Sequence, residues 1–319
     1  MSFLDSFCPL WGPNIKRRLE RRINLSGTSI ILDVPDNNDY PCPEAEPESQ
    51  AINLYDLNYS RWESTDHFES ERFGLLGRAW QYKRRLIGGN VADVRMNISV
   101  FRMPEFQSLF RPRRLECAVE RLIFATPNFS TQESGKNRLN WQIAEDGNRW
   151  VQFEYKGETA LYGCKEHMGV VRLLPLSDEH LLSVVFRFIY YSDSEIARKK
   201  CLALMDTIMA SFRLTLSEDA IRQKNEVEKL YPYEKISAHL PPYEFETVKV
   251  LSEWEIADKV GEQLNHDFPD GFKQLEKLCA IEEAKQELKI KEVREHVLES
   301  HMRFEELERQ DYEKYIFNK

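Results

Sequence analysis

The sequence predicts an α+β fold, in which an antiparallel sheet with packed helices is followed by an acidic, mostly helical C-terminal region. Between residues 94 and 100 apolar and polar residues alternate, and this period of two is typical of a half-buried antiparallel strand. In the last third of the chain apolar residues recur at threes and fours instead, as in amphipathic helices. Acidic residues are also concentrated there: residues 217–319 hold 16 Lys+Arg against 25 Asp+Glu, which accounts for the whole net charge of −9.

The first element expected is a short amphipathic helix over residues 14–22. Ile15, Leu19 and Ile23 are spaced by four, and the basic residues between them would form a solvated face. A phosphate-binding arm is the alternative interpretation of this basic cluster. A strand is expected next, at Ser29–Val34.

Several more strands are expected between residues 75 and 190. Gly88-Gly89-Asn90 and Glu145-Asp146-Gly147-Asn148 have the composition of tight turns, so each predicts a hairpin between the runs that flank it. The run Leu181–Phe186 is apolar on both faces, which places its strand in the centre of the sheet. The expected strands are Leu75–Arg85, Val91–Phe101, the two arms of 140–155, Ala160–Gly163, Val170–Pro175 and His180–Tyr190.

A helix over Ile196–Phe212 is expected to pack on this sheet, because its apolar residues recur at helical spacing. Either Asp193 or Ser194 would cap its N-terminus. Phe212–Leu216 alternates and predicts a closing strand. Later helices are expected at residues 217–230, 254–264 and 271–317. The last would be longer than the usual globular helix, so we expect either a break or a helix that reaches beyond its own domain.

A domain boundary is predicted between Leu216 and Ser217, where the charge balance changes. This division gives an antiparallel α+β domain at residues 1–216. It leaves an acidic helical region at residues 217–319.

The composition argues against several classes of function. An acidic chain repels nucleic acid backbones, so no DNA or RNA binding is expected. No run of about 18 apolar residues is present, so no membrane span is expected either. Residues 1–11 lack the features of an export signal, which makes the cytoplasm the expected location. The six cysteines are far apart in the sequence, so we expect reduced thiols throughout: Cys8, Cys42, Cys117, Cys164, Cys201 and Cys279.

The sequence contains no catalytic motif and predicts no enzyme, cofactor or metal site. Cys164 and His167, together with His180, come nearest to a zinc-ligand set, but two ligands three residues apart without a second pair do not define a site. A reactive thiolate at Cys164, beside Lys165, is the alternative. We prefer the simpler interpretation of a strand cysteine followed by a polar turn.

An early strand ends at Val34-Pro35, and the strand His180–Tyr190 is followed by a helix and the closing Ser211-Phe212-Arg213-Leu214. With the antiparallel strands between them, these features resemble the PsbP/DcrB-like α/β fold over Ser26 to Leu216. The same order of elements occurs in immunity proteins of bacterial type VI secretion systems that are built on this fold. The resemblance implies a protein that binds and neutralises a toxin.

The expected function is that of a non-enzymatic protein-binding protein, an immunity or inhibitor-type protein that neutralises a partner toxin by occlusion. Its negative charge favours a basic partner, such as a basic bacterial toxin, because opposite potentials speed encounter and fix register. The candidate partner-binding residues are acidic and lie near the C-terminus: Glu299, Glu305, Glu306, Glu308 and Asp311. Two alternatives stay open: an assembly or adaptor component of a secretion or phage apparatus, and an enzyme of unrecognised type with a cleft between the two regions.

Overall fold

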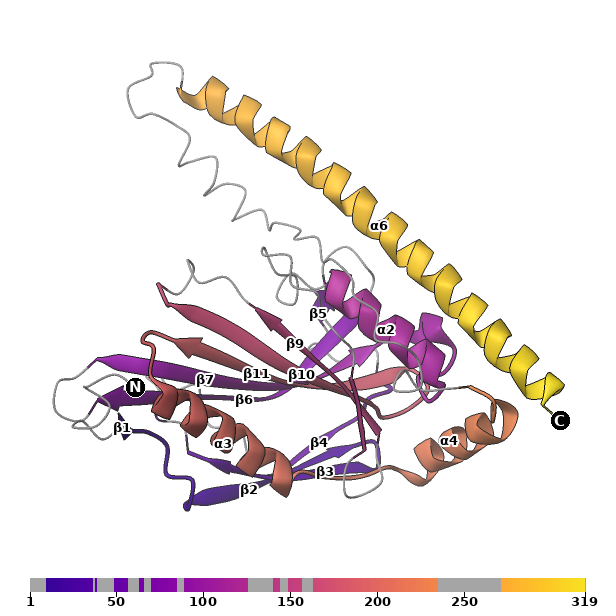
Figure 1. Ribbon diagram of the computed structural model, residues 1–319, viewed down its shortest axis with the longest axis horizontal. Helices are drawn as coiled ribbons and strands as arrows, with labels where there is room; N and C mark the ends of the chain where they lie inside the picture. The colour runs from indigo at the N-terminus through magenta and orange to yellow at the C-terminus, as the bar shows by residue number, and fades with distance from the viewer. Residues whose placement is uncertain are drawn as a thin grey trace.

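In the computed structural model, a large antiparallel sheet carries a smaller sheet and one helix on one face and two packed helices on the other (Figure 1). The α+β class that the sequence predicts is therefore confirmed, including its helical C-terminal region. The structure describes residues 10–36, 38, 49–56, 63–65, 70–84, 89–125, 140–143, 149–156, 163–234 and 271–318.

The main sheet has eight strands among the described residues, and all of their pairings are antiparallel. They are β1 (Leu10–Trp11), β5 (Glu63–Thr65), β6 (Ser70–Arg84), β7 (Asn90–Arg102), β8 (Asn140–Ile143), β9 (Arg149–Lys156), β10 (Glu166–Pro175) and β11 (His180–Tyr190). Their order is β1-β6-β7-β11-β10-β9-β8, and β5 pairs with β6 at its edge. The doubly apolar β11 thus lies in the middle of the sheet, as its sequence predicts.

The smaller sheet contains β2 (Arg18–Leu25), β3 (Thr28–Pro35), β4 (Ser49–Ile52) and β12 (Arg213–Thr215), in the order β12-β3-β2-β4. Its β2–β4 pair is parallel and its other pairs are antiparallel.

β2 overturns the helix predicted for residues 14–22. Arg21, Ile23 and Leu25 are buried at every second position, and the residues between them are exposed. A spacing of four between Leu19 and Ile23 fits both a helix and a strand, so that spacing alone could not distinguish them. Pairing with β3 along the whole length of β2 decides for the strand.

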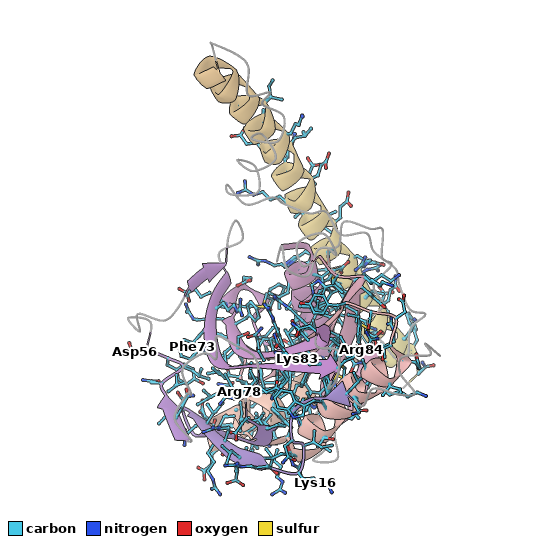
Figure 2. The ribbon with its side chains drawn as sticks, turned by 90° about the vertical axis from the view of Figure 1, so that its left-hand side faces the viewer. Lys16, Asp56, Phe73, Arg78, Lys83 and Arg84 are labelled. Atoms are coloured by element: carbon cyan, nitrogen blue, oxygen red, sulfur yellow. The ribbon has the colours of Figure 1, made fainter. Side chains whose placement is uncertain are left out.

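The helices are η1 (Pro104–Phe106), α2 (Pro112–Ala125), α3 (Glu195–Ser211), α4 (Glu218–Leu230) and α6 (Gly271–Phe317). The Oγ of Ser194 accepts a hydrogen bond from the Ala197 N–H at 3.2 Å, which identifies Ser194 as the cap of α3. α6 is one continuous helix without a break, and it extends well past the sheets and the other described helices (Figure 2). Of the two outcomes expected for it, the structure shows the projecting helix.

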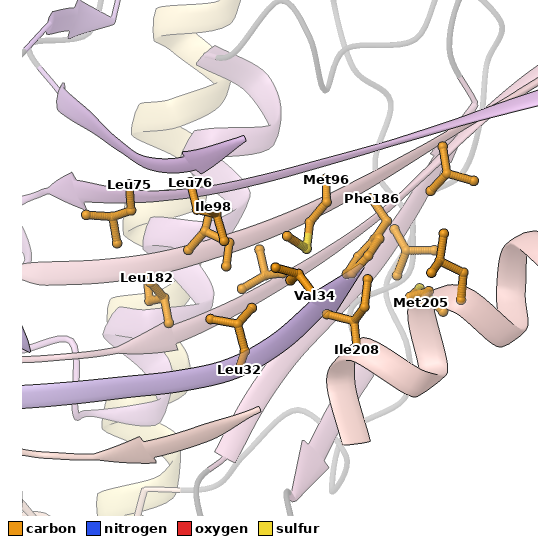
Figure 3. Close-up of a cluster of buried hydrophobic side chains, with 14 of the residues drawn as sticks. Leu32, Val34, Leu75, Leu76, Met96, Ile98, Leu182, Phe186, Met205 and Ile208 are labelled. Atoms are coloured by element: carbon orange, nitrogen blue, oxygen red, sulfur yellow. The ribbon is translucent and has the colours of Figure 1, made fainter. Parts of the chain in front are cut away.

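The first hydrophobic core lies between the main sheet, the smaller sheet and α3. Alternate residues of β7 and β11, among them Met96 and Phe186, face Leu32 of β3 and Ile208 of α3 across it (Figure 3). The alternation that the sequence shows in β7 is thus the pattern of its core-facing side chains.

The second core lies on the opposite face of the main sheet, under α2. Phe153, Val171 and Leu181 rise from β9, β10 and β11 to meet the apolar side of α2. Phe304 of α6 belongs to the same core, although about 180 residues separate it from α2. The C-terminal helix is therefore packed into the body at this point.

A buried histidine closes the turn between β10 and β11. The Nδ1 of His180 lies 2.8 Å from the Ser177 Oγ, and that oxygen also accepts a hydrogen bond from the His180 backbone N–H at 3.1 Å. Burial, with a further contribution from the charge of Arg102, lowers the pKa of His180 to about 4 from its ordinary value of 6.5. The imidazole is therefore neutral in the folded protein at pH 7.

This histidine predicts a loss of stability in acid. Between pH 6.5 and pH 4 the unfolded chain binds a proton at His180 that the folded protein does not, so the free energy of unfolding falls as the pH falls through this window. The full effect is about 3 kcal/mol. Urea unfolding of the native protein and of His180→Asn, measured across this pH range, should show a slope that is steeper in the native protein. Equal slopes would contradict the prediction.

The predicted domain boundary falls at a well-ordered junction. The Ser217 N–H donates to the Thr28 Oγ1 at 3.0 Å, and the Ser217 Oγ accepts from the Ala220 N–H, which caps α4. The division at residue 216 itself stays a prediction. The helix expected at residues 254–264, the hairpin loop at 145–148 and most of the strand expected at 160–163 lie outside the described residues.

Candidate protein-binding surface

Three arginines stand at the start of α2, where Arg111, Arg113 and Arg114 surround Pro112. The N-terminal end of a helix carries positive partial charge, so cations are unfavourable there unless carboxylates compensate them. α6 and the segment that follows α4 supply these carboxylates.

Arg113 lies at the centre of the contact between α2 and α6. Its guanidinium group is fully buried and donates to the Asp311 Oδ2 from Nε at 2.9 Å and from Nη2 at 2.8 Å. Its Nη1 donates to the Glu116 Oε2 at 2.9 Å, one turn along α2. The buried cation is therefore held between two buried carboxylates.

Glu308 of α6 faces the other two arginines. The Arg114 Nη2 donates to its Oε2 at 3.0 Å, and the Arg111 Nη2 lies 3.0 Å from the same oxygen. Arg111 also donates from Nε at 2.7 Å to Glu234, whose pKa burial raises, and its guanidinium stacks over Tyr231 at 3.9 Å. One arginine thus joins α2, α6 and the end of the α4 segment.

One to three turns earlier in α6, a second set of polar contacts joins the same two helices, with the carboxylate on α2 and the donors on α6. Glu120 of α2 accepts a hydrogen bond from the Ser300 Oγ at 2.6 Å and another from Arg303. The side chain of Phe304 lies beside these polar contacts and is buried in the second core. The ring of His301 stacks on that of Phe106, with their centroids 5.2 Å apart. Apolar and ionic contacts therefore alternate along one side of α6.

The docked residues of α6 recur at threes and fours, which places them on one side of the helix. These residues are Ser300, Phe304, Glu308 and Asp311. Near the C-terminus Tyr233 adds ring contacts with Tyr312 at 5.1 Å and Tyr315 at 5.7 Å. The final third of α6 is consequently fixed to the body, and its remaining sides face outward.

The structure divides the five predicted partner-binding residues into two groups. Glu308 and Asp311 face inward and bind arginines of the chain itself. Glu299, Glu305 and Glu306 are exposed on the outer sides of α6. Glu306 accepts hydrogen bonds from Arg309 and Gln310 of the same helix, which lower its pKa to about 2 and keep it charged.

Exposed apolar side chains accompany these three carboxylates. Leu298 is 62% exposed and Met302 is 56% exposed, and both lie within one turn of Glu299 or Glu305. We call this group of five the acidic end of α6: Leu298, Glu299, Met302, Glu305 and Glu306. Apolar side chains with a charged margin are typical of a surface that binds another protein.

The sequence prediction missed the arginines that hold α6. The signal was the run Arg-Pro-Arg-Arg at residues 111–114, in which a proline marks a helix start and cations occupy its unfavourable end. That run could have predicted that carboxylates lie close to these arginines. The sequence does not say which carboxylates meet it.

The other chemical groups singled out from the sequence are not gathered together. His167 pairs opposite Ile189 near one end of β11, and His180 begins that strand at its other end. Among the described residues no group of three or more His, Cys, Asp or Glu side chains could hold a metal ion. None of the described helices combines the length and apolar composition needed to cross a membrane.

Three of the six cysteines can be placed, and these three are free thiols. Burial raises the pKa of Cys117 and of Cys201 to about 12, so both stay protonated and unreactive near neutral pH. Cys164 is half-buried, and burial also raises its pKa. The expectation of reduced thiols stays a prediction, and Cys8, Cys42 and the Cys279 side chain lie outside the described residues.

Comparisons with known proteins place this chain in no family. No family model matches it, and no curated protein matches it. Among solved structures, LpqN of Mycobacterium tuberculosis, which is involved in cell envelope biogenesis, is 8% identical, with 47% of this chain and 94% of LpqN covered and a TM-score of 0.26. A structure from Bacteroides thetaiotaomicron is 8% identical, covers 64% of this chain and 68% of its own, and has a TM-score of 0.21. Both TM-scores are too low for either likeness to support a conclusion.

Proposed function

We propose that this chain is a non-enzymatic protein-binding protein that presents the acidic end of α6 to a cationic protein partner. The observation that carries the proposal is the exposure of Leu298 and Met302 beside Glu299, Glu305 and Glu306, on a helix whose opposite side is fixed to the body. A surface held in place before binding loses little conformational freedom when the partner arrives.

The two kinds of side chain at this surface have different roles in the proposal. The carboxylates attract a basic surface over a Debye length of about 8 Å at physiological salt, which raises the association rate. The apolar side chains lose water on contact and lengthen the life of the complex. Glu308 and Asp311 act indirectly, because they hold α6 in position.

The immunity or inhibitor role is the specific form of this proposal, with a basic bacterial toxin as partner. Two features of the sequence support it. Residues 26–216 resemble the immunity proteins built on the PsbP/DcrB-like fold, and the last third of the chain is acidic. An assembly component is the second candidate, because α6 projects far from the body (Figure 2). Purification with bound partners separates the two: one stoichiometric toxin supports immunity, and several apparatus proteins support assembly.

Charge reversal at the acidic end tests the proposal. Glu305→Lys with Glu306→Lys should slow association with the co-purified partner about tenfold at low salt, and the difference should shrink at high salt. Glu226→Lys with Glu228→Lys is the matched control, because these α4 glutamates are also exposed and the change in net charge is the same. Stopped-flow mixing measures the rates, and circular dichroism verifies the helices. An equal loss in both variants, or no loss in either, would exclude the acidic end as the binding surface.

A further inference from the structure

The projecting part of α6 carries an exposed apolar row that the docking onto α2 does not use. Leu288 is 58% exposed, and Leu298 and Met302 are also more than half exposed. With Ala284 before them, and with Lys291 and Glu295 between Leu288 and Leu298, they follow alternating steps of four and three residues, which is the spacing of a coiled-coil seam. We call this row the heptad face: Ala284, Leu288, Lys291, Glu295, Leu298 and Met302.

The heptad face points away from the body. Successive residues of a helix are about 100° apart, so Met302, two positions from both Ser300 and Phe304, lies on nearly the opposite side from these docked residues. In two views at right angles α6 leaves the body at an angle and its first half stands clear of it (Figures 1 and 2). A second helix can therefore lie along the heptad face without meeting the described strands and helices of the body.

The charges of the heptad face match those of a second copy that runs antiparallel to it. It is apolar at both ends and has two exposed charged residues, Lys291 and Glu295, in the middle. Within one helix the Lys291 Nζ lies 3.9 Å from the Glu295 Oε1. When a second copy is laid antiparallel about residue 293, Lys291 faces the partner's Glu295 and Leu288 faces the partner's Leu298. Ala284 then faces the partner's Met302.

We propose that two copies of this chain associate through their heptad faces as an antiparallel helix pair. A parallel pair in register would place lysine against lysine and glutamate against glutamate, which is repulsive. The antiparallel pair places opposite charges together twice, because the two-fold axis repeats each contact. Buried or half-buried charges at seam positions specify register and orientation in coiled coils.

The geometry of docking also favours this arrangement. The paired span from Ala284 to Met302 is about 27 Å long. Each body is attached to the side of its own helix that faces away from the heptad face. Most of these attachments, at Phe304, Glu308 and Asp311, lie beyond the end of the paired span, so the two bodies lie on opposite sides and toward opposite ends. The paired span shares Leu298, Glu299 and Met302 with the acidic end of α6. The charge-reversal test of the proposed function changes Glu305 and Glu306, which fall outside the paired span, so the two tests can fail separately.

A charge-swap series measured by sedimentation equilibrium tests the proposal. The full-length native chain should form a dimer. Lys291→Glu should raise the dimer dissociation constant about tenfold or more, because it creates two like-charge contacts, and adding Glu295→Lys to it should restore the native value. Lys199→Glu on the exposed side of α3 is the control for net charge and should change nothing.

Cysteine pairing tests the antiparallel orientation. In the antiparallel pair, L288C of one copy faces L298C of the other, so an equal mixture of these two variants should form a mixed disulfide under mild oxidation. L288C alone should not link to itself. Self-linking of L288C would show a parallel pair instead and overturn the proposal.

Two further outcomes would also overturn it. A native chain that stays monomeric over a wide range of concentration would show that no second copy binds at the heptad face. A dimer unaffected by Lys291→Glu would place the interface elsewhere. Either result leaves the charge-reversal test of the acidic end unchanged, since that test measures association with a different protein.

Discussion

Replacing Arg113 by methionine is expected to lower the free energy of unfolding by about 3–5 kcal/mol. The substitution removes the buried cation that contacts the carboxylates of both Asp311 and Glu116. Methionine fills most of the volume of the arginine stem, so the loss is electrostatic rather than a cavity. Urea unfolding followed by circular dichroism measures it.

Two variants make this expectation specific to the buried pair. Arg309→Met removes an arginine that is paired on the surface of α6 with Glu306 and Glu313, and it should change the stability by no more than about 0.5 kcal/mol. The triple variant Arg113→Met, Glu116→Leu, Asp311→Leu should recover most of the loss, because a fully apolar replacement leaves no uncompensated charge. A triple variant as unstable as Arg113→Met alone would show that packing and not charge causes the loss.

Phe304→Ala is expected to cost about 3–5 kcal/mol and to release the final third of α6 from α2. Phe304 is 1% exposed and is the residue of α6 that is buried in the second core together with residues of α2, β9, β10 and β11. The cavity left by the ring would be bounded by two elements that are held together by few other apolar contacts. Amide hydrogen exchange should therefore accelerate over residues 300–311 more than in β11.

Phe317→Ala is the matched control, because this phenylalanine at the end of α6 is 86% exposed. It should alter the stability by less than about 0.5 kcal/mol and leave hydrogen exchange in the docked segment unchanged. Equal effects of the two substitutions would mean that Phe304 does not anchor the helix.

Much of the β-structure could be predicted from the sequence because the signals there are local. The alternation in β7 and the turn composition at Gly89 predict a hairpin from neighbouring residues alone, and the structure pairs β6 with β7. The doubly apolar β11 was predicted for the same reason, and so was a cap of α3 at either Asp193 or Ser194, of which the structure shows Ser194. The prediction failed at residues 14–22, where one spacing fitted two periods and only pairing with β3 decided between them.

The candidate surface was predicted only in part. The charge step after residue 216 identified the acidic end of α6, including Glu299, Glu305 and Glu306. The same charge count could not separate these from Glu308 and Asp311, which turn inward. Charge along a sequence does not record which side of a helix meets another element.

By itself, therefore, the sequence determined the fold class, the central strand, the helical character of the last segment and the acidic character of its end. Only the tertiary structure decided that Arg113 meets Asp311 and that Phe304 enters the core beneath α2. These contacts join residues about 180 to 200 positions apart, and no periodicity or composition within a local window contains that information. Burying the charge of an arginine costs free energy, and a carboxylate that the fold brings next to it offsets this cost.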